Sequence, residues 1–156
     1  MHAYELTLTW EGNEGTGTSE YTRYGRRFRV AMAGKPDLAG SADAAFRGDP
    51  SLHNPEDLLL AAVASCHMLS YLALCARGGV RVVAYADTAH GELEVEPRGG
   101  GRFRAITLRP RVTVASGADV ERATALHALA HERCFIASSC NFPIACEPKV
   151  LAGGAS

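Results

Sequence analysis

The stretch NPEDLLLAAVASCHMLSYLALC, residues 54–75, joins a polar start to an apolar run that carries a thiol, Cys66, near its middle. Asn54 is a residue type that caps helix N-termini well, and proline is favoured at the first helical position. The two acidic residues that follow oppose the positive end of the helix dipole. The sequence therefore predicts a helix from residue 55 to about residue 77, terminated by the two glycines at 78 and 79.

This predicted helix is apolar on all sides, since residues 58–75 include no charged residue. A helix of that kind lies in the middle of a fold or of an oligomer. The run of about 18 residues reaches the lower edge of transmembrane length. Four polar or amphipathic side chains interrupt it, namely Ser65, His67, Ser70 and Tyr71. We therefore expect a buried helix of a soluble protein, with no membrane partner.

The segments on either side of the helix alternate between apolar and polar residues, as strands do. Before the helix we expect strands at 3–10 and 21–33 and a long ordered loop at 34–53. After it we expect one or two strands at 80–96, a hairpin turn at 98–102, a strand at 103–115 with an edge or bulge at Pro110, a helix at 119–133 and a last strand at 142–151. This order predicts one α+β domain over residues 1–156.

The length, composition and net charge of the chain indicate its general class of protein. It has 156 residues, 47% hydrophobic and 21% charged, which is ordinary for a soluble globular protein. A net charge of −1 gives no field that favours nucleic acid or an anionic membrane. The N-terminus shows no secretory signal, and the five cysteines are an odd number. We therefore expect a cytoplasmic protein with free thiols and no structural disulfides.

Two thiols are candidates for chemistry. Cys66 is either a small buried apolar residue or a nucleophile, and as a nucleophile it needs a nearby cation, because a free thiol has a pKa of about 8.5. Cys134 lies at the end of the second predicted helix, where the dipole disfavours an anion. That place suits a resolving thiol, although packing at a helix end is the alternative. In a peroxide-reducing sequence Cys66 becomes a sulfenic acid, Cys134 condenses with it to a disulfide, and an external thiol reduces the pair.

Glu56 precedes Cys66 by ten residues, which is about 15 Å along one straight helix. It therefore cannot contact Cys66 of the same helix. Glu56 either serves only the helix start, or it orients a mobile arginine, or it contributes to a site that a second subunit completes.

A metal site is a further hypothesis. The pattern consists of two histidines and three cysteines, namely His127, His131, Cys134, Cys140 and Cys146. It lacks the short Cys-x2–4-Cys pairs of most zinc sites, and solvent-facing histidines on an amphipathic helix are the commoner arrangement. We expect no metal and no cofactor, and the sequence leaves open whether Cys75, Cys140 and Cys146 have a role beyond packing.

The stretch NPEDLLLAAVASCHM resembles the OsmC/Ohr family of osmotically inducible and organic hydroperoxide resistance proteins, and ALAHERCFIASS resembles its second-cysteine segment. The likeness covers roughly residues 20–150. It implies antiparallel strands wrapped around two central helices, an intertwined homodimer with sites at the interface, and thiol-dependent reduction of organic hydroperoxides or hydrogen peroxide in oxidative stress defence. Under this resemblance Cys66 is peroxidatic, Cys134 is resolving and Glu56 is the partner of an activating arginine.

The sequence departs from the hydroperoxide-resistance branch at two places. The early glycine-rich segment EGNEGTGTSEY has no arginine, so Arg26 and Arg47 are the substitutes, with solvated surface charge as their alternative role. Phe135 stands where the family often has proline after the second cysteine. The partners expected are a hydroperoxide and a thiol or dithiol reductant. The alternative function is a non-enzymatic dimer that binds a small hydrophobic ligand.

Overall fold

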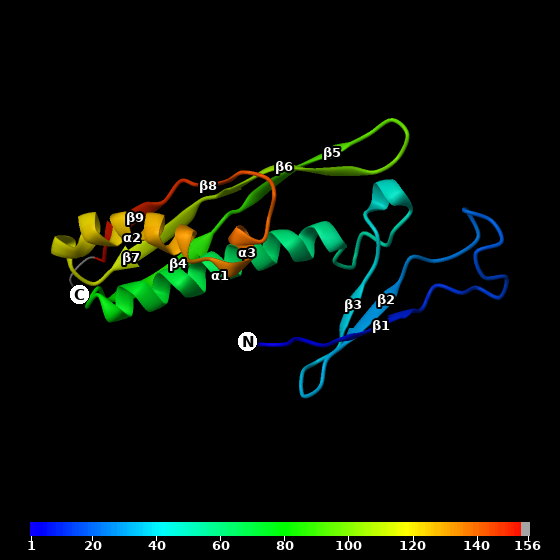
Figure 1. Cartoon of the computed structure of the whole chain (residues 1–156), viewed down its shortest axis with the longest axis horizontal. Helices are drawn as coiled ribbons and strands as arrows, with labels where there is room; N and C mark the ends of the chain where they lie inside the picture. The colour runs from blue at the N-terminus through cyan, green and yellow to red at the C-terminus, as the bar shows by residue number, and fades with distance from the viewer. Residues whose placement is uncertain (154–156) are drawn as a thin grey trace. The chain divides into compact units, whose positions relative to one another are not determined.

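A computed structural model of the chain describes residues 1–153 (Figure 1). The chain forms two compact units, Met1–Leu59 and Leu60–Ser156. Its elements agree with the α+β class predicted from the sequence, with two main helices and three small sheets. The assignment of residues 1–156 to one domain stays a prediction.

The N-terminal unit contains a three-stranded antiparallel sheet in the order β1-β2-β3, formed by Thr7–Trp10, Phe28–Ala31 and Leu38–Gly40. The strands predicted at 3–10 and 21–33 are therefore confirmed only in part. Residues 21–24 form turns and residues 25–27 belong to no strand, and Gly25 N–H donates to the Gly12 carbonyl at 2.8 Å. The loop predicted at 34–53 is also wrong in part, since it includes β3 and a short 3-10 helix, η1, at Ala44–Phe46.

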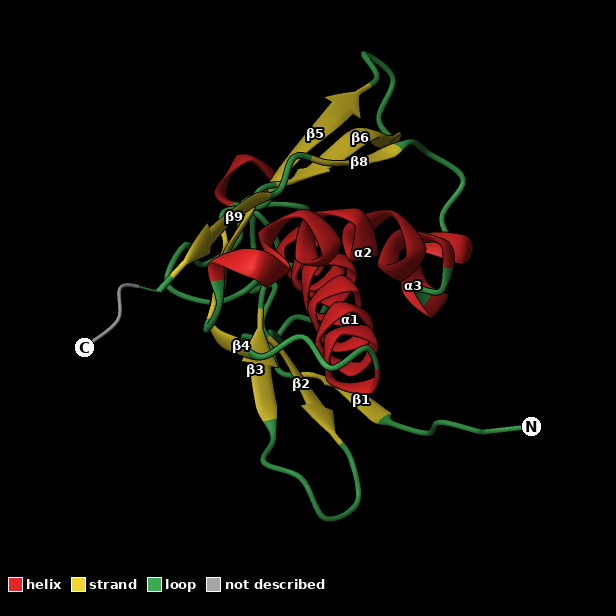
Figure 2. Cartoon of the chain, turned by 90° about the vertical axis from the view of Figure 1, so that its left-hand side faces the viewer, coloured by secondary structure: helices red, strands yellow, loops and turns green. Residues whose placement is uncertain are grey.

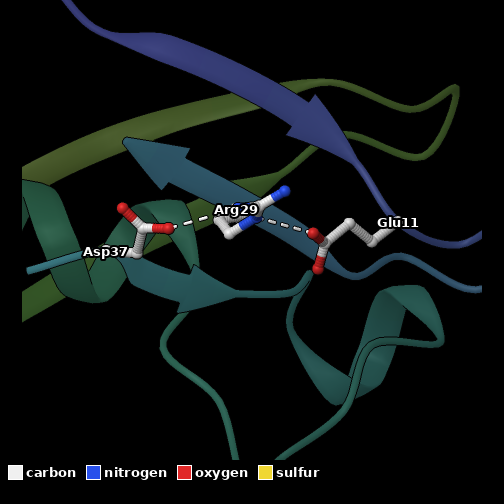
Figure 3. A network of polar contacts seen from close by, with 3 residues as sticks. All are labelled: Glu11, Arg29 and Asp37. Atoms are coloured by element: carbon white, nitrogen blue, oxygen red, sulfur yellow. Dashed lines mark hydrogen bonds and ion pairs between the residues drawn. The ribbon is translucent and has the colours of Figure 1, made fainter. Parts of the chain in front are cut away.

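One arginine links the segments of this sheet through exposed ion pairs (Figure 3). From β2, Arg29 Nε donates to Glu11 Oε1 at 2.7 Å and its Nη1 donates to Asp37 Oδ2 at 3.2 Å. Glu11 and then Asp37 raise the pKa of Arg29. Because all three side chains are exposed to solvent, we expect this network to contribute little to stability.

The helix α1 spans Pro55–Arg77, as the sequence predicted. Its start is a reciprocal cap, since Asp57 N–H donates to Asn54 Oδ1 at 2.8 Å and Asn54 N–H donates to Asp57 Oδ2 at 3.3 Å. Its end is a glycine cap, because Gly79 adopts φ +73° and Val80 N–H donates back to the Cys75 carbonyl at 2.9 Å.

We predict that Asn54→Ala lowers the free energy of unfolding by about 1 kcal/mol, because it removes the side-chain acceptor at the helix start. Urea denaturation of both proteins measures this difference. Asn141→Ala, at an exposed position outside any helix or strand, is the control and leaves the midpoint unchanged. Equal losses in the two variants would contradict the capping role.

The C-terminal unit contains two mixed sheets. One has the order β4-β7-β9 and the other β5-β6-β8, with β7/β9 and β6/β8 parallel. Their bounds are Val82–Asp87 (β4), His90–Val95 (β5), Gly101–Leu108 (β6), Pro110–Val114 (β7), Ile144–Cys146 (β8) and Lys149–Ala152 (β9). The strand predicted at 103–115 divides at Arg109, where the chain passes from one sheet to the other, and the strand predicted at 142–151 also divides in two. The expected antiparallel pairing therefore holds for β4/β7 and β5/β6, whereas the pairs that include β8 and β9 are parallel.

The second main helix, α2, spans Val120–Glu132, close to the predicted bounds, and a 3-10 helix, η2, at Gly117–Asp119 precedes it. It is followed by α3, Phe135–Ser138, a short helix that the sequence analysis did not predict. Figure 2 shows α1 and α2 side by side.

Two apolar clusters form the core of the C-terminal unit. The larger joins α1, α2 and the sheet β4-β7-β9 through buried Tyr71, Leu74, Cys75, Val80, Val112, Val114, Ala123, Ala130 and Val150. The smaller joins α1 to β6 through Val63, Ile106 and Leu108. Both clusters use α1, so this helix organises the packing of the unit.

Only one stripe of α1 is buried within the chain, at Val63, His67, Tyr71, Leu74 and Cys75. Leu69, on another side, is 64% exposed. A single chain therefore covers α1 only in part, and its expected place in the middle of an oligomer stays a prediction. By length and composition α1 could also cross a membrane, at a mean hydropathy of 1.9 over its most apolar window. Its place in both apolar clusters instead identifies it as a core helix with one uncovered apolar face.

Candidate functional site

Cys66 lies half-buried on α1, in the wall of an open hollow of about 500 Å³. The residues that line the hollow come from α1 and α3 and are all uncharged, namely Ala62, Ser65, Cys66, Leu69, Ser70, Phe135 and Ile136. Phe135 is 83% exposed, so a large aromatic ring borders the thiol. The Ser65 hydroxyl is occupied within its own helix, where it donates to the Ala61 carbonyl at 2.7 Å. The surroundings of Cys66 therefore suit an apolar molecule.

Cys134 is fully buried beside Cys66, and both are free thiols. Burial, together with the neighbouring Cys66 thiol, raises the pKa of Cys134 to about 11. The structure thus brings together the two cysteines that the sequence analysis singled out, from α1 and from the segment after α2. A thiol with this pKa stays protonated at neutral pH and is not an attacking nucleophile by itself.

Cys134 does not lie at the end of α2, as the sequence predicted, but at the start of α3. The helix α2 ends at Glu132, and Cys134 caps the next helix, where its Sγ accepts from Ala137 N–H at 3.5 Å. That contact favours the thiolate, whereas burial disfavours it and is the larger effect. Burial, and not the dipole of α2, is therefore what keeps this thiol protonated.

We predict that the two thiols of reduced protein differ in their rates of alkylation. Iodoacetamide modifies half-buried Cys66 near neutral pH, whereas buried Cys134 stays unmodified until the pH approaches about 11, where its thiolate forms. Peptide mass spectrometry at a series of pH values measures both rates. Faster labelling of Cys134 than of Cys66 at neutral pH would contradict this order.

The other three predicted site residues belong to the N-terminal unit. Glu56 is half-buried in the first turn of α1. The guanidinium of Arg26 lies 3.9 Å from the ring centroid of Tyr24 and 4.6 Å from that of Tyr21. It also donates to the carbonyls of both tyrosines, so Arg26 is held by its own unit rather than fully solvated.

Arg47 is exposed and ends η1 with φ +65°, and its Nη2 donates to the Thr22 carbonyl at 3.5 Å. The contacts of Arg26 and Arg47 described here are with tyrosine rings and backbone carbonyls of the same unit. Activation of Cys66 by either arginine, and orientation of that arginine by Glu56, stay predictions.

The structure also shows a buried polar cluster of which the sequence analysis named two members, His127 and Cys146, but missed His67. His67 Nε2 lies 3.0 Å from His127 Nδ1 and 3.6 Å from Cys146 Sγ. The Tyr71 ring stacks on the His127 ring with centroids 3.8 Å apart. The prediction that His127 faces solvent is wrong, because only 3% of it is exposed. The burial of His67 could have been predicted from the sequence. Val63, His67 and Tyr71 are each four residues apart, so they lie on one face of the helix.

Burial sets the protonation of this cluster. It lowers the pKa of His67 to about 4 and that of His127 to about 4, so both rings are neutral at pH 7. It raises the pKa of Cys146 to about 11. The residues of the predicted metal pattern therefore lie at different places in the structure. His127 and Cys146 lie beside His67, whereas Cys134 lies beside Cys66.

These features define an α+β protein with two neighbouring free thiols, of which Cys66 lines an apolar hollow and Cys134 is buried behind it. The family model described as OsmC-like protein matches residues 48–149. That range is more than half of the chain, so the chain belongs to the OsmC-like family, and the resemblance noted in the sequence is confirmed.

Solved structures of similar fold agree with this assignment. An OsmC-like protein of unknown function from Vibrio cholerae has a TM-score of 0.84 and 28% identity, covering 96% of this chain and 100% of that one. An organic hydroperoxide resistance protein OsmC from Legionella pneumophila has a TM-score of 0.67 and 19% identity, covering 96% and 98%. The organic hydroperoxide resistance protein OhrB of Bacillus subtilis has a TM-score of 0.62 and 21% identity, covering 94% and 98%. No curated protein matches the sequence significantly.

Proposed function

We propose that this protein is a cytoplasmic thiol-dependent peroxidase that reduces organic hydroperoxides or hydrogen peroxide in oxidative stress defence. The observation that carries the proposal is the pairing of half-buried Cys66, at an open hollow, with buried Cys134. Two proteins of the same fold are named for organic hydroperoxide resistance, which supports the same chemistry here.

The proposed reaction has three steps. The Cys66 thiolate attacks the O–O bond of the hydroperoxide, which leaves as an alcohol, or as water from hydrogen peroxide, while Cys66 becomes a sulfenic acid. The Cys134 thiol then condenses with the sulfenic acid, which forms the Cys66–Cys134 disulfide and releases water. An external dithiol, or two thiols, reduces this disulfide by exchange and is itself oxidised to a disulfide.

The lining of the hollow favours organic hydroperoxides over hydrogen peroxide. Its walls include exposed apolar side chains, notably Leu69 and Phe135, which would bury the hydrocarbon part of such a substrate. Hydrogen peroxide has no such part, so we expect cumene hydroperoxide to show the larger kcat/KM.

A second subunit is part of the proposal. The apolar outer face of α1 is uncovered within one chain, and Leu69 on that face is 64% exposed. A homodimer that covers this face would remove apolar area from water. In this proposal Arg26 or Arg47, oriented by Glu56, supplies the positive charge that favours the Cys66 thiolate.

The alternative is a non-enzymatic dimer that binds a small hydrophobic ligand. The uncharged lining of the hollow favours it, because none of the seven residues there can stabilise a thiolate by charge. This alternative predicts slow alkylation of Cys66 near neutral pH and binding of an apolar fluorescent probe that a hydroperoxide does not consume.

The deciding experiment follows loss of cumene hydroperoxide with dihydrolipoamide or dithiothreitol as the electron donor. The peroxidase proposal predicts many turnovers per chain above the rate of the donor alone. Absence of turnover with both donors, in protein whose thiols are shown to be reduced, would contradict it and favour the binding protein.

A further inference from the structure

Three side chains have no part in the proposed peroxide chemistry. Their possible metal-ligand atoms face one another. They are His67 from α1, His127 from α2 and Cys146 from β8, and their ligand atoms all lie within 4.8 Å of one another. We propose that these three residues bind one zinc ion. The proposal replaces the expectation, drawn from the sequence, that the chain binds no metal.

The distances in the cluster are close to those that zinc requires. Bonds of about 2.0–2.1 Å to nitrogen and about 2.3 Å to sulfur place two tetrahedral nitrogens about 3.3 Å apart, and nitrogen and sulfur about 3.5 Å apart. The observed separations are 3.0 Å between His67 Nε2 and His127 Nδ1, and 3.6 Å between His67 Nε2 and Cys146 Sγ. The third pair, His127 Nδ1 and Cys146 Sγ, lies within 4.8 Å, so binding one ion requires these two atoms to approach to about 3.5 Å.

The ligand types select zinc over hard cations. Two imidazole nitrogens and a thiolate suit zinc, whereas calcium and magnesium require oxygen ligands, of which the cluster has none. Three protein ligands leave a fourth tetrahedral position for water or an added anion.

The surroundings hold the two imidazoles in place. The His67 and His127 rings are within 9° of parallel, and the Tyr71 ring stacks on His127 at 10°. Each histidine comes from a helix whose inner face lies in the core of the unit, and both rings are almost fully buried. Packing restricts both side chains, which lowers the conformational cost of binding an ion, and the two facing nitrogens must turn from each other toward that ion.

The protons of the cluster can be accounted for. Without an ion, one of the two facing nitrogens carries a proton and donates to the other. With zinc bound, the facing nitrogens offer lone pairs, the ring protons reside on His67 Nδ1 and His127 Nε2, and the Cys146 thiol releases its proton to solvent. The two outer nitrogens have no partner in the described part of the chain in either state, so zinc creates no additional unsatisfied group.

The first test uses reduced protein that has been stripped with EDTA and then titrated with zinc alone against a chromophoric chelator. We expect one zinc per chain. Replacement by Co²⁺ reports the ligands directly, since a four-coordinate site with one thiolate shows a sulfur-to-cobalt charge-transfer band together with intense visible bands. Zinc uptake well below one per chain, or a cobalt complex without the charge-transfer band, would overturn the proposal.

Matched variants separate this site from the other thiols. Cys146→Ser changes one atom and is expected to lower zinc affinity by more than about 100-fold and to remove the cobalt band. Cys140→Ser and His131→Ala alter residues of the sequence pattern that lie outside the cluster, so both retain zinc and the band. Unchanged zinc affinity in Cys146→Ser, or loss of zinc binding in both control variants, would overturn the assignment. Neither readout depends on peroxide turnover, so failure here leaves the proposed peroxidase function standing.

Discussion

Replacing Cys66 with serine abolishes hydroperoxide reduction, with a loss of at least about 100-fold in kcat/KM, because the hydroxyl cannot replace the thiolate that attacks the O–O bond. The substitution changes one atom on a half-buried part of α1, so the fold should persist. Consumption of cumene hydroperoxide with dihydrolipoamide as donor measures the effect, and circular dichroism checks the fold.

Cys140→Ser is the matched control for this variant. Cys140 is also a half-buried free thiol, but it packs against the apolar cluster around Val63 and lies outside the lining of the hollow. The control retains the turnover of the unchanged protein. Turnover by Cys66→Ser equal to that of Cys140→Ser would exclude Cys66 as the nucleophile.

The second large effect is expected for Cys134→Ser. Without the buried thiol, the sulfenic acid on Cys66 has no partner with which to condense, so turnover with a dithiol falls by at least about 10-fold. The sulfenic acid accumulates, and dimedone traps it as a mass-shifted adduct on the Cys66 peptide. Excess peroxide then drives that cysteine to the sulfinic acid, which the unchanged protein avoids.

This variant distinguishes a resolving thiol from a structural one. A purely structural role for Cys134 would lower stability without increasing dimedone labelling of Cys66. Unchanged turnover, with no adduct on Cys66, would mean that another thiol resolves the intermediate.

Local signals in the sequence were sufficient to predict α1. Asn54 and the following proline fix its start, and Gly79 adopts the positive φ that ends it, so both bounds follow from residues next to them. The strands were predicted less well because their lengths depend on distant partners. Residues 21–27 alternate like a strand, yet residues 21–24 form turns and Gly25 pairs with distant Gly12 outside any strand.

In the candidate site, too, the features marked by local sequence could be predicted, and those that depend on distant residues could not. Cys66 and Cys134 were predictable from two motifs and from thiol chemistry, and the structure places them together. The pairing of His67 with His127 joins residues 60 positions apart, and Cys146 approaches His67 across 79 positions. The spacing on α1 indicates that His67 is buried, but only the packing of α1 against α2 and β8 shows that it meets His127 and Cys146.

Whether Cys66 and Cys134 react as a pair is tested most directly by identifying the disulfide that forms on treatment with peroxide. Reduced protein is treated with one equivalent of cumene hydroperoxide, its remaining thiols are alkylated, and the digest is analysed by mass spectrometry without reduction. We expect one linked peptide pair that joins Cys66 to Cys134, while Cys75, Cys140 and Cys146 are recovered without a disulfide. A disulfide from Cys66 to any other cysteine, or full recovery of unlinked Cys66 and Cys134 after the peroxide is consumed, would contradict it.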